Sequence, residues 1–252
     1  MLKSRAIKRT IPIFAVLILW GIGSQFSSPL FLPHPTKVWE TFLELIQNGM
    51  LLNSLKASFL RITTATVLAA AISIPIGLLV ANYKFIDDMV TPITGFMRFM
   101  PVTAFYPLLI MWIGIGEVMK VSFLFFATIF FFLPTVILSV KNVSMDLVDT
   151  ARTMGMSKLK VMTKVLLPAS LPSILQSFLM MYGIGWTYII IAEMVNTTVG
   201  LGYLMNIGSA RGRTDMVFAA LMVILIVSWF VDTVGNAAIR RLFKWRFIRK
   251  SD

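Results

Sequence analysis

The chain has 252 residues, of which 58% are hydrophobic and only 13% are charged, and its formal net charge at pH 7 is +12. Charged residues make up about 25% of an ordinary soluble domain, so this composition excludes that class and favours a polytopic membrane protein. The chain has no cysteine, which excludes disulfides, thiolate metal sites and redox motifs. The positive charge is explained more simply by membrane-proximal loops on anionic headgroups than by binding to nucleic acid.

Apolar stretches predict an all-α fold with six transmembrane helices. They cover residues 11–26, 57–80, 90–115, 118–140, 171–195 and 216–239, and a hydrocarbon core of roughly 30 Å needs helices of about this length. No small-residue cleavage site follows the first stretch, so we expect a retained span and not a signal peptide. The third stretch contains Pro92, Pro101 and Pro107, and we expect it to be kinked or partly unwound.

Between the first two spans, residues 36–46 are predicted to form a helix. Apolar residues recur there at spacings of three and four, which is typical of an amphipathic helix in the membrane interface, and Thr36 is its expected N-cap. His34, the single histidine, precedes this helix between two prolines. Because no cluster of metal-ligating residues accompanies it, we interpret His34 as a solvated or interfacial side chain.

The distribution of lysine and arginine predicts the orientation of the chain. With both termini assigned to the cytoplasm, 16 of these residues fall in cytoplasmic segments and 6 on the other side. The positive-inside rule therefore places both termini and the loop of residues 141–167 in the cytoplasm.

That loop is the one basic, amphipathic segment between spans. Residues 146–164 have a helical pattern that is interrupted at Gly155, where a positive φ and a helix C-cap are expected. Ser157 can cap a second helix, which is predicted to run up to Pro168. The first helix is predicted to carry one apolar face, formed by Leu147, Val148, Ala151 and Met154. This face fits either the anionic surface of the membrane or a groove in a partner protein, and the residues alone leave both possibilities open.

Energy-using chemistry is absent from the sequence. No phosphate-binding G-x-x-x-x-G-K-[ST] loop occurs, and the glycines between 183 and 202 form no nucleotide fingerprint. The ionisable residues within or near the predicted spans include Arg98, Glu193 and Asp232. Because a charge facing lipid costs a few kcal/mol, each is expected either to line a solute pathway or to pair inside the helix bundle.

The loop resembles a family motif. The segments Leu147-Val-Asp-Thr-Ala-Arg-Thr-Met-Gly-Met-Ser157 and Lys164-Val-Leu-Leu-Pro-Ala-Ser-Leu-Pro172 look like the E-A-A-x-x-x-G cytoplasmic motif of binding-protein-dependent ABC importer permeases. Asp149, Thr150 and Ala151 match its E-A-A positions, and Gly155 matches its glycine. Asp149 keeps the acidic charge, and Thr150 adds only a hydroxyl group.

Further segments over about residues 30–245 resemble the nitrate/sulfonate/taurine/bicarbonate subfamily. They are Leu32-Pro-His-Pro-Thr-Lys-Val-Trp39, Arg98-Phe-Met-Pro-Val102, Trp112-Ile-Gly-Ile-Gly-Glu117, Ala192-Glu-Met194, Gly200-Leu-Gly-Tyr203 and Arg213-Thr-Asp215. The second of these lacks the first proline of the R-P-I-P turn found in the subfamily.

The resemblance implies the type I ABC importer permease fold, a single permease domain over residues 1–252 and a place in a prokaryotic inner membrane. Implied partners are a second copy of the chain, two cytoplasmic ATPase subunits, an extracytoplasmic solute-binding protein and the lipid bilayer, with no nucleic acid. The chain would hold no cofactor, because the ATPase would bind ATP and Mg. The expected substrate is a small anion or a small organic solute such as a sulfonate.

The resemblance also implies which residues act. The expected ATPase-coupling residues are Leu147, Asp149, Thr150, Ala151, Arg152, Gly155 and Met156. Arg98, Glu193 and Met194 are the candidate pathway residues, and no catalytic or metal site is expected. The alternatives are a secondary carrier or channel that acts without ATP and a membrane assembly or scaffold protein. A carrier is less favoured because the sequence shows neither two related halves nor a chain of intramembrane acids.

Overall fold

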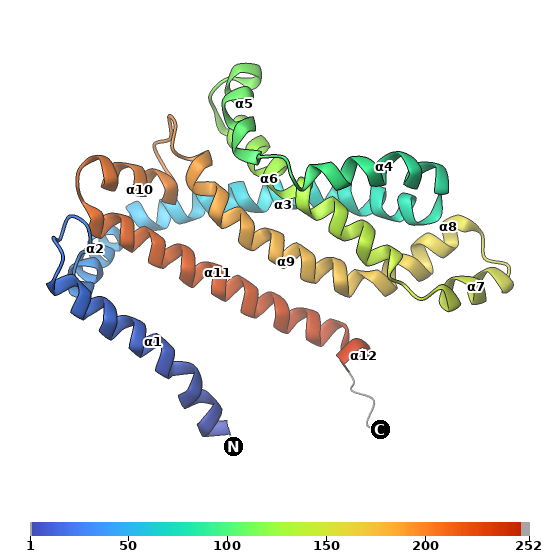
Figure 1. The fold of residues 1–252 in the computed structure, drawn as a ribbon, viewed down its shortest axis with the longest axis horizontal. Helices are drawn as coiled ribbons and strands as arrows, with labels where there is room; N and C mark the ends of the chain where they lie inside the picture. Colours follow the sequence, from blue (N-terminus) through green and yellow to red (C-terminus); the bar gives the residue numbers. More distant parts are fainter. Residues whose placement is uncertain (1, 248–252) are drawn as a thin grey trace. The chain divides into compact units, whose positions relative to one another are not determined.

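The structure is a computed structural model that describes the backbone of residues 2–247 and the side chains of residues 14–246. Every regular element in this part of the chain is a helix, which confirms the predicted all-α fold (Figure 1). The chain divides into two compact units, residues 1–58 with 197–226 and residues 59–196 with 227–252. The long helices α3 (Met50–Asn82) and α11 (Thr214–Leu242) contribute residues to both units.

The first unit also contains α1 (Leu2–Gln25), α2 (Pro35–Gln47) and α10 (Leu201–Ala210). Helix α2 confirms the predicted amphipathic helix, since Val38 and Leu45 are buried while Trp39 remains exposed. The prediction of Thr36 as its N-cap is wrong. The helix begins one residue earlier, at Pro35, because the fixed φ of proline suits the first helical position. His34 is the actual N-cap, and its exposed ring accepts a hydrogen bond at Nδ1 from the Thr36 N–H.

The second unit holds the remaining elements. They are α4 (Lys84–Met97), η1 (Val102–Ala104), α5 (Phe105–Ile113), α6 (Glu117–Lys141), α7 (Met145–Thr153), α8 (Lys158–Val161), η2 (Met162–Leu166), α9 (Leu167–Ala192) and α12 (Lys244–Phe247), with parts of α3 and α11. Helices α6 and α9 pack side by side along much of their length. One apolar cluster, centred on Phe132, Val136 and Ile174, joins them to α3 and to α7.

Glycines let α3, α6 and α9 approach one another closely. A Cβ atom on Gly185 of α9 would lie 2.8 Å from the Ile62 side chain of α3. A Cβ atom on Gly77 of α3 would lie 2.7 Å from the Val136 side chain of α6. Small residues commonly allow this kind of close helix packing in membrane proteins. The three helices therefore form the packed centre of the second unit.

The predicted spans are confirmed in part. Among the described residues, four helices are long and apolar enough to cross a membrane: Met50–Asn82, Glu117–Lys141, Lys158–Ala192 and Thr214–Leu242. Helix α4 and the η1–α5 pair qualify only together, with a bend of 86° between them. The described apolar part of α1, Phe14–Gln25, is shorter than a span, and its earlier side chains lie outside the described residues. The total of six spans therefore stays a prediction.

The bend in the third span confirms that this segment is interrupted. The helix stops at Met97 and resumes at Val102, so the break covers residues 98–101 and contains Pro101. A residue that precedes proline is pushed out of the α region, which explains why the helix ends there. Pro92 lies inside α4 and Pro107 lies near the start of α5, and neither ends a helix.

Candidate functional site

The turn between α7 and α8 confirms the positive φ and the helix C-cap expected at Gly155. This residue has φ of +78°, and its N–H donates to the Arg152 carbonyl at 2.9 Å. The Met156 N–H donates to the Ala151 carbonyl at 3.1 Å, so the pair of hydrogen bonds forms a Schellman C-cap. Apart from residue 155 and its two chain neighbours, no described residue has an atom within 4 Å of the position that a Cβ on residue 155 would occupy. Backbone conformation, and not lack of space, therefore requires glycine here.

The apolar side chains of α7 point in two different directions, whereas the sequence predicts that they share one face. Val148 and Ala151 are only 4% and 5% exposed and pack into the apolar cluster with Leu78 and Val161. Leu147 is 52% exposed and Met154 is 74% exposed. The prediction of a single apolar face is therefore wrong. On a helix of nine residues the positions 148 and 151 point inward together, and the positions 147 and 154, two turns apart, point outward.

The outward side of α7 also carries most of the polar candidates. Thr150 Oγ1 donates to the Asp146 carbonyl at 2.6 Å, and Arg152 lies 3.5 Å from Asp149 in an ion pair whose side chains are at least half exposed. A shallow depression in this surface is lined by Asp146, Asp149, Thr150, Thr153 and Met154.

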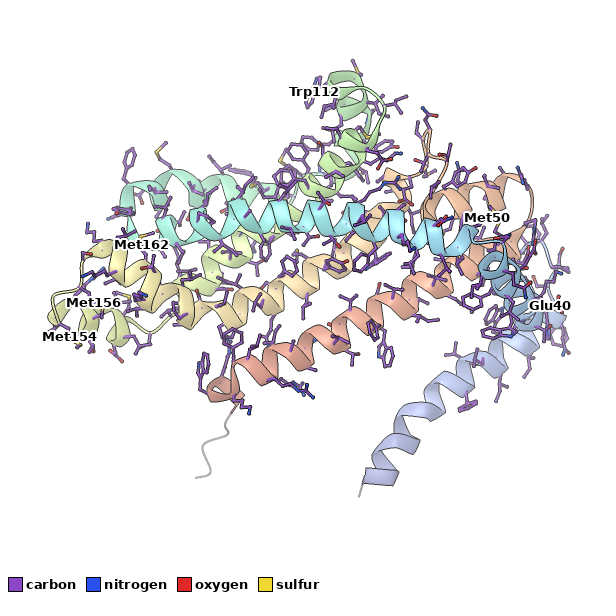
Figure 2. The ribbon with its side chains drawn as sticks, turned by 180° about the vertical axis from the view of Figure 1, so that it is seen from behind. Glu40, Met50, Trp112, Met154, Met156 and Met162 are labelled. Carbon is purple, nitrogen blue, oxygen red and sulfur yellow. The ribbon has the colours of Figure 1, made fainter. Side chains whose placement is uncertain are left out.

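The predicted coupling residues therefore separate into two groups. Leu147, Asp149, Thr150, Arg152 and Gly155 lie at the surface, whereas Ala151 is buried and Met156 is half-buried. Figure 2 shows Met154 and Met156 at the end of the second unit that α7 and α8 form. The buried group anchors α7, and the exposed group is free to contact another molecule.

The second helix of the segment differs from the prediction. Ser157 is its N-cap position, although its side chain makes no capping hydrogen bond. The expected end before Pro168 is wrong, because the helix continues from Lys158 to Ala192. A π-helical turn, Met162–Leu166, immediately precedes Pro168. The wider turn accommodates the ring and the missing N–H of proline, so the segment after Gly155 and the span form one continuous helix.

At the opposite end of the same helices lies an ion cluster that is buried except for Glu117, whose side chain is 61% exposed. The Arg61 guanidinium of α3 contacts Glu193 Oε1 through Nη1 at 2.6 Å. It also binds both carboxylate oxygens of Glu117, at 2.6 Å and 2.7 Å, in a bidentate pair. Lys120 Nζ donates to Glu117 at 3.0 Å. Glu117 begins α6, and Glu193 follows the last residue of α9, so the cluster joins α3, α6 and α9.

The cluster gives Glu193 a charged partner inside the bundle. Its side chain is fully buried, and those of Arg61 and Lys120 are 9% and 4% exposed. The buried Glu193 carboxylate is paired with the buried Arg61 guanidinium, as burial of a charged group requires. Glu193 therefore pairs inside the bundle, and its role in the pathway stays a prediction. The charge count of the sequence places Arg61 on the extracytoplasmic side and so does not point to it as a partner. The usable signal is that an intramembrane acid calls for a base in a neighbouring apolar helix.

The other candidate pathway residues lie on separate elements. Arg98 is exposed at the end of α4, where the third span bends. Met194 is 50% exposed and follows α9. Asp232 lies exposed on α11, and Asn236 Nδ2 donates to its carboxylate at 2.9 Å.

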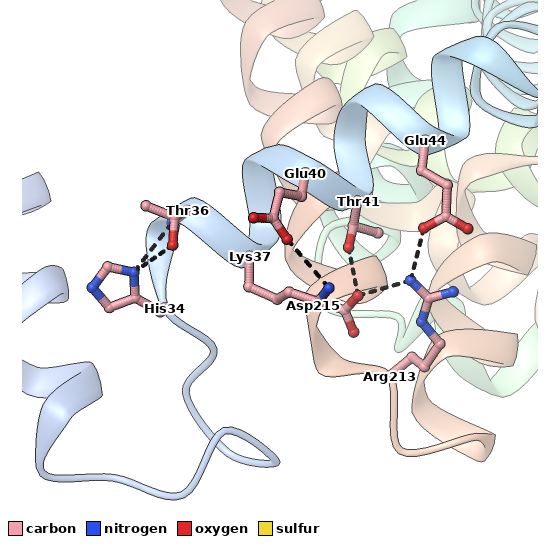
Figure 3. A network of polar contacts seen from close by, with 8 residues as sticks. All are labelled: His34, Thr36, Lys37, Glu40, Thr41, Glu44, Arg213 and Asp215. Atoms are coloured by element: carbon pink, nitrogen blue, oxygen red, sulfur yellow. Dashed lines mark hydrogen bonds and ion pairs between the residues drawn. The ribbon is translucent and has the colours of Figure 1, made fainter.

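In the first unit, a polar network ties α2 to the start of α11 (Figure 3). Asp215 accepts hydrogen bonds from Thr41 Oγ1 at 2.6 Å and from Arg213 Nη2 at 2.9 Å. Arg213 also lies 3.3 Å from Glu44. The hydrogen bond to Asp215, with a smaller contribution from Glu44, raises the pKa of the Arg213 guanidinium above its usual value. The Arg213-Thr-Asp215 segment therefore holds two helices together.

Among the residues that the structure describes, no group of three or more His, Cys, Asp or Glu side chains is arranged to hold a metal ion.

The sequence and fold define the class of this protein. Residues 73–245 match the family described as binding-protein-dependent transport system inner membrane component, and the chain belongs to this family. It is a multi-pass membrane protein and a permease of the ABC importer class.

Proteins with similar sequences identify the subfamily to which the chain belongs. The chain is 31% identical over 250 residues to the taurine transport system permease protein TauC of Escherichia coli strain K12, with 96% of this chain and 91% of TauC covered. It is 29% identical to the putative aliphatic sulfonates transport permease protein SsuC of Bacillus subtilis strain 168, with 92% of this chain and 84% of SsuC covered. These relatives confirm the resemblance to the nitrate/sulfonate/taurine subfamily.

Solved structures confirm the type I importer permease fold. The inward-facing MetNI methionine ABC transporter aligns with a TM-score of 0.69 at 18% identity, over 77% of this chain and 96% of that one. A bacterial alginate ABC transporter in complex with a periplasmic protein bound to an alginate pentasaccharide aligns with a TM-score of 0.62 at 19% identity, over 95% of this chain and 98% of that one.

Proposed function

We propose that this chain forms the solute pathway of an ABC importer as a pair of identical copies, and that residues 146–164 couple it to a separate ATPase. In this arrangement both termini and α7 face the cytoplasm. Two ATPase subunits bind there with ATP and Mg, and an extracytoplasmic solute-binding protein delivers the substrate on the other side.

The division of α7 into a buried and an exposed side is the observation that supports coupling best. Val148 and Ala151 fasten α7 to the packed centre of the second unit, so α7 and the spans move together. Leu147 and Met154 remain available for a groove in a partner, which is the helix-in-groove mode of recognition. A force on the outer side of α7 would therefore reach α3, α6 and α9 directly.

The rigid continuation into the span supports the same function. Because α8, η2 and α9 form one helix from Lys158 to Ala192, a displacement beside Gly155 is carried along the whole fifth span. At the far end, the Arg61–Glu193 pair links that span to α3. ATP-driven closure of the ATPase pair would rock these helices and expose the pathway alternately to each side of the membrane.

A small organic anion of the sulfonate class is the proposed substrate. The names of the taurine and aliphatic sulfonate permeases among the relatives support this class. Proteoliposomes that contain this chain, its ATPase and its binding protein should take up taurine or an alkanesulfonate only when ATP is supplied. Uptake by this chain alone, without ATP, would instead establish the carrier alternative.

The coupling role predicts that one substitution at α7 weakens ATPase binding and that another lowers the stability of the chain. Met154→Ala should weaken association with the ATPase by about tenfold, because an exposed contact residue is shortened, and should leave the melting temperature unchanged. Val148→Ala should lower the stability of the chain by about 2 kcal/mol, because it opens a cavity in the apolar cluster. Binding of purified ATPase and thermal unfolding in detergent measure the two effects. Equal ATPase binding by Met154→Ala and the wild type would argue against docking on this side.

A further inference from the structure

A groove of about 400 Å³ lies behind α7 in the second unit. It is bounded by the end of α6, the approach to α7, the first turns of α9 and the short helix α12. Its lining residues are Ser139, Asn142, Val143, Ser144, Leu147, Ala169, Pro172, Ser173, Trp245 and Arg246. The groove shares no lining residue with the depression formed by Asp149 and Met154. It does include Leu147, which also belongs to the exposed side of α7 that we propose contacts the ATPase.

The polar lining suits an anion. Arg246 is the single charged residue of the lining, and its Nη1 donates to Ser173 Oγ at 2.6 Å. This bond uses one of five guanidinium N–H groups, and no acidic partner of Arg246 is found among the described residues. The side chains of Ser144 and Asn142 add hydroxyl and amide groups to the same groove. Guanidinium groups bind phosphate oxygens in bidentate pairs, so the chemistry fits a phosphate ester.

The remaining lining is apolar and lies where membrane spans end. Val143, Leu147, Ala169 and Pro172 form one wall. Trp245 is 62% exposed, and its ring packs edge-on against the buried Phe243. Tryptophan and arginine at the end of a span are typical of the headgroup region of the bilayer. A ligand for this groove therefore needs both a phosphate and an apolar part.

The surrounding charge selects an anionic lipid over a zwitterionic one. The end of α11 and α12 carry Arg240, Arg241, Lys244 and Arg246 within seven positions, and the chain as a whole has a net charge of +12. Under the proposed orientation this end faces the anionic cytoplasmic leaflet. Basic pockets between helices on that side bind the headgroups of anionic lipids.

We propose that this groove binds the headgroup of an anionic phospholipid, such as phosphatidylglycerol or cardiolipin. Arg246 contacts the phosphate, and the acyl chains leave along the apolar wall beside Trp245. Because Ser144 and Leu147 line the groove from the α7 side, a bound lipid restrains the residues that lead into α7. Lipid binding therefore tunes the position of α7, and this second statement rests on the proposed coupling function.

The lipid contact is tested by native mass spectrometry of the purified chain in nanodiscs. Phosphatidylglycerol mixed with phosphatidylcholine should be retained on the wild type in preference to phosphatidylcholine. Arg246→Gln should lower that retention by about tenfold, because a charge-assisted hydrogen bond is lost. Lys244→Gln removes the same charge from the same short helix without altering the lining, and it should lower retention much less than Arg246→Gln does.

Equal losses in Arg246→Gln and Lys244→Gln would overturn the proposal, because binding would then depend on net charge alone. Retention of phosphatidylcholine equal to that of phosphatidylglycerol would overturn it as well. Inorganic phosphate is added to the chain in detergent to separate the two sources of phosphate. If it displaces retained lipid or stabilises the wild type as strongly as phosphatidylglycerol does, the ligand is a free anion and the lipid proposal fails.

The effect on α7 is read separately, as ATPase activity of the assembled complex in the two lipid mixtures. The wild type should be more active with phosphatidylglycerol, and Arg246→Gln should lose this difference. Lipid retention requires neither the ATPase nor the solute. Failure of the coupling proposal therefore appears as an unresponsive ATPase with lipid still bound, whereas failure of the groove proposal appears as loss of selective retention.

Discussion

Arg61→Met is expected to destabilise the protein by about 3–5 kcal/mol, the cost of removing one partner from a buried ion pair. Glu193 is fully buried and lies 2.6 Å from the Arg61 guanidinium, so the substitution leaves its carboxylate inside the bundle without that charge. The three helices that the cluster joins should then separate more readily at this end. Thermal unfolding of the purified chain in detergent measures the loss.

A matched control is provided by the pair of Lys37 and Glu40, whose side chains are 61% and 67% exposed. Lys37→Met also exchanges a paired base for methionine, and it should have little effect because exposed ion pairs contribute little. Adding Glu193→Gln to Arg61→Met should restore part of the stability, since a buried amide costs less than a buried charge. A loss in Arg61→Met no greater than that in Lys37→Met would show that the cluster does not stabilise the bundle.

Gly155→Val is expected to reduce solute-stimulated ATPase activity of the complex by about tenfold, since a β-branched residue at positive φ stores roughly 1–3 kcal/mol of strain. The φ of residue 155 is +78°. Relief of the strain would change the angle between α7 and the helix that begins at Lys158. The chain should still insert in the membrane, because the turn lies outside the spans.

Gly155→Asn separates backbone conformation from the mere presence of a side chain. Asparagine tolerates the left-handed region, and the space beside residue 155 is open, so this variant should keep most of the stimulated activity. The ratio of stimulated to unstimulated ATPase rates in proteoliposomes distinguishes the two variants. Wild-type stimulation in Gly155→Val would remove Gly155 from the coupling mechanism.

The local features of this protein were predictable because they depend on neighbours in the sequence. Helix α2 follows from apolar spacing, and the interruption of the third span follows from its prolines. The turn at Gly155 follows from a glycine placed after a short helical pattern. The motif around Asp149 and Gly155 also identified the family, since it depends on residue types at fixed separations.

Two predictions about helix ends were wrong because the residues at those positions allow more than one backbone conformation. Thr36 and His34 can both cap α2, and Pro35 decided in favour of His34 by taking the first helical position. Pro168 suggested the end of a helix, but the preceding π turn allows the helix to continue. In both cases the identity of the residues was informative, and the outcome depended on backbone geometry that the pattern does not contain.

The amino-acid sequence by itself determined the all-α membrane class, the approximate spans and the family, because hydrophobic length and motif spacing are properties of the linear chain. Only the tertiary structure decided which side of α7 is buried and which base pairs with Glu193. Arg61 and Glu193 are 132 positions apart, and they meet because α3 and α9 pack closely through Gly185 and Ile62. Such a contact depends on how helices are placed against one another, so the periodicity of a single helix cannot reveal it.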